Sequence, residues 1–221
     1  QEEADRVVPV VRGIRDAGSD VVISVDTFDA RVAEAALTAG ADVINDTTCL
    51  SDPDLASVVA EAGAHLVVPH SLAAPRTVYP RPPYNDVTAE VIQRLGQAVT
   101  KAVDGGVPES HLFVDPGHDL NKNTEDTLRI TRELSEVAAM GFPTLAAVSN
   151  KDFIGETLDL PKQDRAAGSI AAAVYCLHEG ARVIRMHNVT QSVHAARMFE
   201  AMAGWRRPAY TRHNMGEINL P

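Results

Sequence analysis

The segment FVDPGHDLNKN, residues 113–123, begins as an apolar strand and ends in a dense group of polar side chains. Pro116-Gly117 marks a turn. From Asp115 to Lys122 the chain then presents two acids, a histidine, an asparagine and a lysine. Ligands of α/β folds bind at the carboxyl ends of the strands, where polar side chains of this kind belong. The segment therefore predicts both a buried strand, HLFVDPG (111–117), and one sector of a binding site.

Five further segments have an apolar body and a polar carboxyl end. They are continuous apolar runs, which is typical of parallel strands buried on both faces. Their polar ends should meet at one edge of a common sheet and surround one mouth. The segments are VVISVDT (21–27), ADVINDT (41–47), HLVVPH (65–70), PTLAAVSN (143–150) and ARVIRMH (181–187).

Helix-period segments separate these strands, each ending near a glycine and beginning at a cap such as Asp29 or Thr124. A complete (β/α)₈ TIM barrel has eight strands in about 250 residues. This chain opens with the helix-like segment 2–18 and then shows six strands. We therefore expect an α/β barrel that lacks its first two strands over residues 1–204, followed by a tail over 205–221. The absence of a glycine-rich phosphate loop disfavours a nucleotide-binding doubly wound sheet.

Composition narrows the function and the location. The net charge is −10, from 30 acidic and 20 basic residues, which disfavours nucleic-acid binding. The two cysteines, Cys49 and Cys176, are not in a metal-binding spacing, and we expect small buried thiols in a reducing cytoplasm. No apolar run reaches the ~20 residues of a membrane span, so no membrane association is expected.

Five motifs in order resemble the dihydropteroate synthase family. They are SVDT (24–27), IND (44–46), VDPG (114–117), SNKDFIG (149–155) and RMH (185–187). The resemblance runs from residue 1 to about 204, over what would be the third to eighth strands of that family's barrel. It is strongest to the second, divergent homologue of actinobacteria, which the tail segment 204–216 also fits.

The resemblance implies a reaction and a set of residues. The family joins p-aminobenzoate to 6-hydroxymethyl-7,8-dihydropterin pyrophosphate and releases pyrophosphate, as a cytoplasmic homodimer that uses Mg²⁺. Its metal-ligand asparagine belongs to an N-terminal loop with no counterpart here, so no metal ligand is expected in this chain. Catalytic roles would fall to Asp26, Asp115 and Lys151. The pterin would be bound by Asp26, Asn45, Asp115, Lys151 and Arg185, and the pyrophosphate by Arg185 and His187.

The sequence departs from the family on the aminobenzoate side. After Asp-Pro-Gly the family has an apolar residue, Gly, Phe and a small residue, where this chain has His118, Asp119, Leu120 and Asn121. The family's Ser-Arg-Lys is Ser149, Asn150 and Lys151 here, so a cation near an anionic substrate is lost. The altered side would comprise Leu120, Ser149 and Asn150.

Three functions stay open: a synthase, a paralogue that binds pterins without synthase activity, and a methyltetrahydrofolate-type domain passing a methyl group to a corrinoid partner.

Several of these residues also have an ordinary structural interpretation. Asp-Pro-Gly alone is good turn chemistry, and a lysine such as Lys151 usually faces solvent. His187 could be a core histidine, and for His70 a structural role is as good an interpretation as a functional one. One histidine beside one acid does not make a metal site, so His118 is expected in a supporting or surface role.

Overall fold

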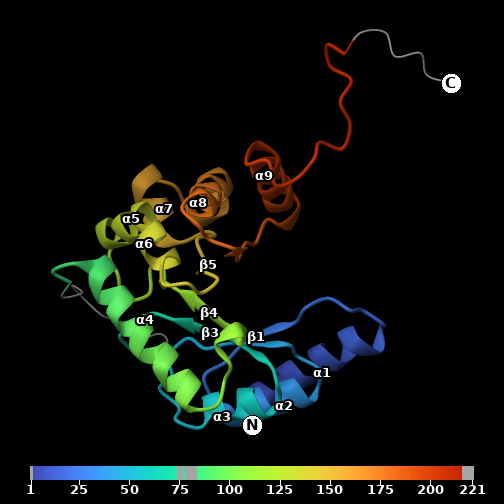
Figure 1. Ribbon diagram of the computed structural model, residues 1–221, viewed down its shortest axis with the longest axis vertical. Helices are drawn as coiled ribbons and strands as arrows, with labels where there is room; N and C mark the ends of the chain where they lie inside the picture. The colour runs from blue at the N-terminus through green and yellow to red at the C-terminus, as the bar shows by residue number, and fades with distance from the viewer. Residues whose placement is uncertain (1, 74–76, 78–83, 216–221) are drawn as a thin grey trace.

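The computed structural model describes residues 2–73, 77 and 84–215, and helices alternate with strands through this part of the chain (Figure 1). A helix precedes the first strand, as the sequence predicts. The helices are α1 (Glu2–Asp16), α2 (Ala30–Thr38), α3 (Leu55–Glu61), α4 (Val87–Asp104), α5 (Thr124–Arg132), α6 (Leu134–Ala138), α7 (Asp152–Leu158), α8 (Ala166–His178) and α9 (Val189–Met202). Two short 3₁₀ turns are η1 (Glu109–His111) and η2 (Lys162–Asp164).

Each strand lies inside the segment that the sequence predicts for it, although the last two are only two residues long. The strands are short because a regular ladder of hydrogen bonds forms only where two neighbouring backbones stay parallel. The strands are β1 (Ser24–Asp26), β2 (Val43–Asn45), β3 (His65–Pro69), β4 (Leu112–Asp115), β5 (Leu145–Ala146) and β6 (Val183–Ile184).

The strands pair in the order in which they occur along the chain. β1 to β4 form one parallel ladder, β5 and β6 form a second, and a parallel bridge between Val114 and Thr144 joins the two. In a doubly wound sheet the strand order would reverse at a switch point, whereas in a barrel each strand lies beside the next. Within the described residues the outer edges of β1 and β6 have no partner strand. The fold is therefore the partial α/β barrel that the sequence predicts.

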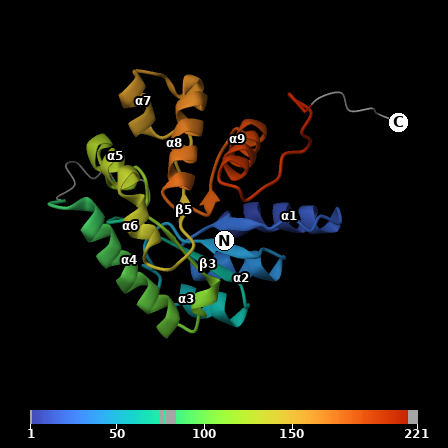
Figure 2. The same ribbon diagram turned by 45° about the horizontal axis from the view of Figure 1, so that its top comes forward.

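The helices lie around the outside of the strands, with α1 to α4 beside the first ladder and α5 to α9 beside the second (Figures 1 and 2). Apolar side chains between these two layers are fully buried. Among them Ile44, Leu66, Leu112 and Val114 are each 0% exposed. This core fixes the positions of the strands, and so the positions of their polar carboxyl ends.

The sequence names two helix N-caps, and one of the two is confirmed. The Asp29 side chain accepts a hydrogen bond from Arg31 N at 2.9 Å and caps α2, as predicted. The cap predicted at Thr124 is wrong by one residue, because the Asn123 side chain accepts from Asp126 N at 2.7 Å and Thr124 is already helical. Both residue types are good caps, so the sequence alone could not separate them.

Residues 205–215 continue beyond α9 as an exposed segment that leads away from the body of the molecule (Figure 1), and residues 216–221 lie outside the described part. At the start of the segment, the Trp205 ring contacts Phe199 edge to face at 5.5 Å. The guanidinium of Arg182 lies 5.2 Å from the same ring. The first residue of the tail is therefore attached to α9 and to the start of β6.

Candidate functional site

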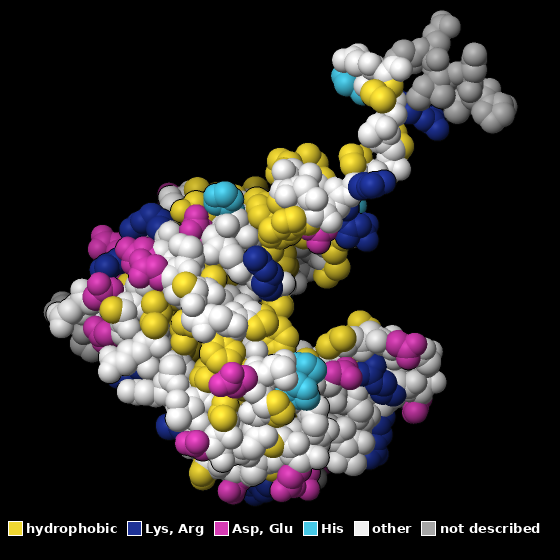
Figure 3. Space-filling view, viewed as in Figure 1, with side chains coloured by type: hydrophobic (Ala, Val, Ile, Leu, Met, Phe, Trp, Pro, Cys, Tyr) yellow, Lys and Arg dark blue, Asp and Glu magenta, His cyan; other side chains and the backbone are white. Residues whose placement is uncertain are grey.

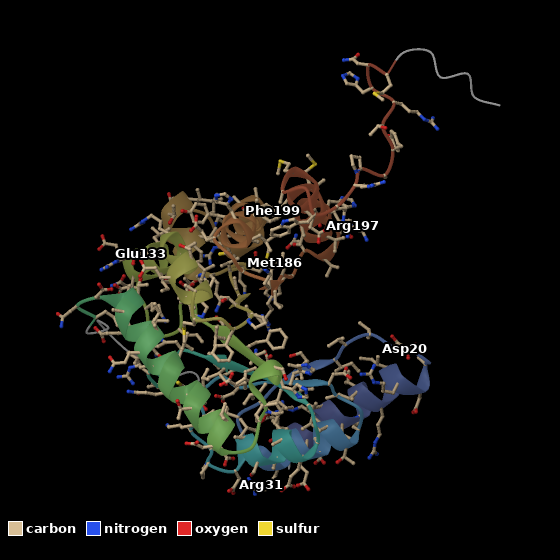
Figure 4. The ribbon with its side chains drawn as sticks, in the orientation of Figure 1. Asp20, Arg31, Glu133, Met186, Arg197 and Phe199 are labelled. Carbon is tan, nitrogen blue, oxygen red and sulfur yellow. The ribbon has the colours of Figure 1, made fainter. Side chains whose placement is uncertain are left out.

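Polar side chains occupy the carboxyl ends of the strands. β1 ends at Asp26, β2 at Asn45 and β4 at Asp115, while Ser149 follows β5 and Arg185 follows β6. Because all the strands are parallel, these ends share one edge of the sheet. Figure 3 shows the molecule hollowed between α1 and α9, with hydrophobic side chains on the walls of the hollow. In Figure 4, Met186 marks the end of β6, beside α9.

Asp26, Asn45 and Arg185 form one hydrogen-bonded group. The strand register pairs Asp26 with Asn45, and Asn45 Nδ2 donates to Asp26 Oδ1 at 2.8 Å. Arg185 Nη2 donates to the other carboxylate oxygen, Asp26 Oδ2, at 3.2 Å. Asn45 Oδ1 is buried without a hydrogen-bond partner among the described residues. An unpaired buried acceptor is costly, so this oxygen is suited to receive an N–H group from a ligand.

Asp115 is the buried acid of this edge. It is 5% exposed, and its Oδ1 accepts from Gly117 N at 2.7 Å. Burial raises the pKa of the Asp115 carboxyl, while that hydrogen bond and the charges of Lys151, Lys122 and Arg185 act in the opposite direction. Positive side chains from three different loops therefore lie within electrostatic range of one buried acid.

Gly117 makes the tight turn after Asp115 possible. Its φ is +69°, and a Cβ at this position would stand 2.1 Å from the carbonyl oxygen of His70. A larger residue would push apart the ends of β3 and β4. The Asp-Pro-Gly turn is thus both a local structure and the means by which Asp115 is placed.

Ser149 connects the end of β5 to the end of β6. Its Oγ accepts from His187 N at 3.1 Å and lies 2.8 Å from His187 Nδ1. His187 itself is exposed, whereas Ser149 is buried. The hydrogen bonds fix the orientation of the imidazole and leave Nε2 directed elsewhere, which suits contact with an anion.

Lys151 lies at the N-terminus of α7, with its backbone in an extended conformation and its side chain half-buried. The Lys151 charge affects the pKa values of Asp115, His118 and Asp119. The charge of Lys151 thus lies within electrostatic range of these three groups, and its role as a pterin ligand stays a prediction.

The loops after β4 and β5 contain three non-glycine residues with a left-handed backbone: Asp119 (φ 61°), Asn121 (φ 52°) and Asn150 (φ 58°). Asp and Asn tolerate this conformation better than most residues. Asp119 Oδ2 accepts from Asp152 N at 2.5 Å and from Phe153 N at 3.3 Å. Burial raises the pKa of the Asp119 carboxyl. The acid thus bonds to the first amides of α7, which the sequence did not predict.

The other aminobenzoate-side residues point to different neighbours. Asn150 N donates to Ser169 Oγ on α8 at 2.9 Å, and Ser169 Oγ lies 3.4 Å from Asn150 Oδ1. Leu120 is half-buried and its carbonyl accepts from Lys122 Nζ at 3.2 Å. The structure brings Asn150 toward α8 rather than toward Asp26 and Arg185.

A buried pair, Lys122 and His70, was missed by the sequence interpretation. Lys122 Nζ lies 2.9 Å from His70 Nδ1 and donates to the Gly117 carbonyl at 3.0 Å. Burial lowers the pKa of Lys122 to about 7 and that of His70 to about 3. A signal was present, because Lys122 follows the turn at a strand end, but a lysine in a polar segment usually faces solvent. The pair ties the end of β3 to the loop after β4.

His118 is fully buried, so of the two roles expected for it the surface role is wrong and the supporting role stays a prediction. Its ring stacks on Phe153 at 6.4 Å, and neither ring nitrogen has a hydrogen-bond partner among the described residues. Burial lowers the pKa of His118 to about 3. The turn at Gly117 directs this side chain inward, against α7, instead of outward.

The rest of the described chain offers little for a metal. No group of three or more His, Cys, Asp or Glu residues within it is arranged to hold a metal ion.

Burial raises the pKa of both thiols, that of Cys49 and, to about 12, that of Cys176. None of the helices described is long and apolar enough to cross a membrane.

Comparisons with known proteins concern the sequence and the fold. The family model described as "Pterin binding enzyme" matches residues 1–187. A protein of Mycobacterium leprae named "Inactive dihydropteroate synthase 2" is 40% identical over 214 residues, 95% of this chain and 74% of that protein. The dihydropteroate synthase of Bacillus subtilis is 38% identical over 203 residues, 91% of this chain and 68% of that enzyme.

Solved structures show the same relationship. A Yersinia pestis dihydropteroate synthase in a sulfonamide drug complex superposes with a TM-score of 0.89 at 33% identity, over 93% of this chain and 75% of that one. The Xanthomonas albilineans dihydropteroate synthase with 4-aminobenzoic acid has a TM-score of 0.85 at 34% identity, over 91% and 72%. The fold and the sequence thus both point to one family.

Proposed function

Because the chain belongs to the dihydropteroate synthase family of pterin-binding enzymes, we propose that it binds a pterin at the carboxyl ends of its strands and condenses it with p-aminobenzoate only weakly, if at all. Asp115 supports the pterin half of this proposal. A buried carboxylate surrounded by positive charge is suited to a ligand with two adjacent N–H donors. The amino group and ring N–H of a pterin are such a pair.

The neighbouring residues would complete the pterin contacts. Asn45 Oδ1 is a buried acceptor with no partner in the described part of the chain, and Asp26 is held beside it. Lys151 would contact the pterin carbonyl, with Asp115 below it. A site built to hydrogen-bond such donors rejects a flat ring that lacks them, since its buried groups would then be left unpaired.

Arg185 and His187 would bind the leaving pyrophosphate. In the family reaction the C–O bond between the pterin methylene carbon and pyrophosphate breaks, and the aminobenzoate nitrogen bonds to that carbon and gives up a proton to solvent. The negative charge then grows on the leaving group, so a guanidinium beside it stabilises the transition state. Arg185 is half exposed at the mouth, with its guanidinium on Asp26, and can exchange part of that contact for a phosphate.

The aminobenzoate half is where activity would be lost. Asn150 stands where the resemblance places an arginine, and its side chain is turned toward Ser169. Leu120 replaces an aromatic residue that would flank the substrate ring. Losing one charge-assisted contact costs about 1.5–3 kcal/mol, or roughly one to two decades in affinity. This half of the proposal is supported by a relative at 40% identity that is named as an inactive synthase.

The proposal keeps Mg²⁺ as the cofactor that the resemblance implies. Within the described residues no group of three or more His, Cys, Asp or Glu residues is arranged to hold a metal ion, and no step is derived through a metal. The proposal keeps the division into a barrel over residues 1–204 and a tail over 205–221. It also keeps the homodimer and the cytoplasmic location that the resemblance implies. Size-exclusion chromatography with light scattering would test the homodimer, and cell fractionation would test the location.

The test separates binding from condensation. Calorimetry with 6-hydroxymethylpterin measures binding, and release of pyrophosphate from 6-hydroxymethyl-7,8-dihydropterin pyrophosphate with p-aminobenzoate measures turnover. We expect measurable pterin binding with slow turnover. In the double variant Asn150→Arg with Leu120→Phe, kcat/KM for aminobenzoate should rise about tenfold at unchanged pterin affinity.

The proposal has two ways to fail. Rapid turnover by the wild type would show that Leu120 and Asn150 are neutral changes and that the chain is an ordinary synthase. No binding of 6-hydroxymethylpterin would show that the strand-end group has another ligand.

A further inference from the structure

We propose that Asp119 is a positioning residue, which holds Lys151 over the pterin pocket by bonding the first amides of α7. The inference rests on the pterin site proposed above. Asp119 stands in the loop after β4, whereas Lys151 belongs to the loop after β5. The Asp119 carboxylate is a hydrogen-bonded connection between the loop after β4 and the start of α7, since its Oδ2 accepts from Asp152 N at 2.5 Å and from Phe153 N at 3.3 Å.

The geometry at Asp119 indicates a built contact rather than a chance one. The residue adopts a left-handed backbone with φ 61°, a conformation that costs a non-glycine residue free energy. Its own N–H donates to Thr127 Oγ1 on α5 at 3.3 Å. Asp119 therefore has contacts with both α5 and α7, and these fix the direction in which its carboxylate points.

The loop that contains Asp119 is anchored on its other side as well. Asn121 Oδ1 accepts from Leu72 N at 2.8 Å and from Ser71 Oγ at 3.0 Å, both beyond the end of β3. Lys122 Nζ bonds the Gly117 carbonyl at 3.0 Å and contacts His70 Nδ1 at 2.9 Å. The loop is thus fixed to β3, and Asp119 extends that rigid connection to α7.

Lys151 directly precedes the two amides that Asp119 bonds. Its side chain is half-buried, and its charge acts on the buried Asp115 carboxyl. If the contact from Asp119 is lost, the N-terminus of α7 can move away from the loop, and Lys151 moves with it. A ligand then binds only the fraction of molecules in which Lys151 is in place, which lowers the apparent affinity by that fraction.

The test compares three variants of the full chain. Asp119→Gly removes the carboxylate and also relieves the left-handed backbone. Asp119→Asn keeps an oxygen that can accept from the α7 amides while it removes the charge. Asp159→Gly is the matched control, because Asp159 has the same left-handed backbone (φ 52°) at the opposite end of α7 and is exposed.

The measurements are affinity for 6-hydroxymethylpterin by calorimetry and amide hydrogen exchange at Asp152 and Phe153. We expect Asp119→Gly to bind the pterin about tenfold more weakly and to exchange these two amides faster. Asp119→Asn should stay within about threefold of the wild type, and Asp159→Gly should match it. Melting temperatures of all variants confirm that the comparison is made on folded protein.

The failures are distinguishable. A wild type that does not bind 6-hydroxymethylpterin overturns the proposed function and this inference with it. A wild type that binds, together with an Asp119→Gly variant of equal affinity, overturns the inference alone. An Asp119→Asn variant as weak as Asp119→Gly also overturns it, since charge rather than the hydrogen bonds would then be what matters.

Discussion

The strand-end part of the candidate site and its loop part are built in different ways. Asp26 and Asn45 are paired residues of neighbouring strands, so the register of the sheet places them side by side. Asp119 and Asn150 lie in loops with left-handed backbones, and hydrogen bonds with α7 and α8 fix them. The sheet thus preserves one part under substitution, whereas a single exchange in the loops can alter the other.

This difference explains how a family member can keep one substrate contact and lose another. Asp115 belongs to both the strand-end part and the loop part of the site, because it is the last residue of β4 and the loop begins directly after it. Changes that disturb the sheet should therefore affect pterin binding most, and changes confined to loops should affect the second substrate or the stability. The following variants test that order.

Asp115→Asn should have the largest effect on binding. A neutral amide offers one acceptor instead of two charged ones, so affinity for 6-hydroxymethylpterin should fall about a hundredfold. Calorimetry measures this fall, with Asp126→Asn on α5 as the control acid. Unchanged affinity in Asp115→Asn would remove Asp115 from the pterin site.

The same variant should be more stable than the wild type near neutral pH. Because burial raises the pKa of Asp115, the folded protein holds this proton at higher pH than the unfolded chain does. As the pH rises from 3.8, the ordinary pKa of this carboxyl, through its raised pKa in the folded protein, Asp115 progressively lowers the free energy of unfolding. Calorimetric melting at pH 7 should show a higher melting temperature for Asp115→Asn, and a lower one would contradict the burial argument.

Arg185→Lys should have an intermediate effect. Lysine keeps the charge but loses the planar fork that binds phosphate oxygens in pairs, so inorganic pyrophosphate should bind about tenfold more weakly. Arg182→Lys is the matched control, since Arg182 lies at the other end of the same strand, against Trp205. Equal losses in the two variants would show that the effect is structural and not local to the mouth.

His118→Phe should have the smallest effect and should change stability rather than binding. Both ring nitrogens of His118 are buried without partners in the described part of the chain, so an apolar ring of similar shape should stabilise the fold by about 1 kcal/mol at pH 7. His111→Phe is the control, because His111 Nδ1 lies 3.2 Å from the Ala64 carbonyl. Chemical denaturation measures the free energy of unfolding of both variants.

The pH dependence gives a second test of His118. Its folded pKa of about 3 lies below the ordinary 6.5, so the unfolded chain binds the proton first and stability falls as the pH drops from 6.5 toward 3. His70 behaves in the same way. The fall should be smaller in His118→Phe than in the wild type. An equal fall would assign the pH dependence to His70 and other groups.

The sequence predicts the sheet well because buried parallel strands have an unmistakable pattern. Ile44, Leu66 and Val114 each come from an apolar run that the sequence identifies. The positions of Asp26, Asn45 and Arg185 follow from the strand ends, without knowledge of any contact. Asp26 and Asn45 meet because β1 and β2 are parallel neighbours, whereas the contact of Arg185 with Asp26 joins the two outermost strands of the sheet.

The loop contacts could not be predicted in the same way. Asp119 bonds to amides 33 and 34 residues away, and no local pattern indicates which backbone a side chain will reach. Lys122 is buried against the general tendency of lysine, because carbonyl groups of its own loop surround it. His118 is turned inward by the conformation of Gly117, which the sequence shows only as a turn signal.

The order of the strands has a consequence for how the chain folds as it is made. Each strand pairs with one that leaves the ribosome shortly before or after it, so β1 to β4 can assemble from nearby segments while the rest is still being synthesised. The contact between Asp26 and Arg185 spans 159 residues and must wait for β6. The mouth therefore forms last, and a nascent chain that has already built most of its sheet is still unable to bind its ligand.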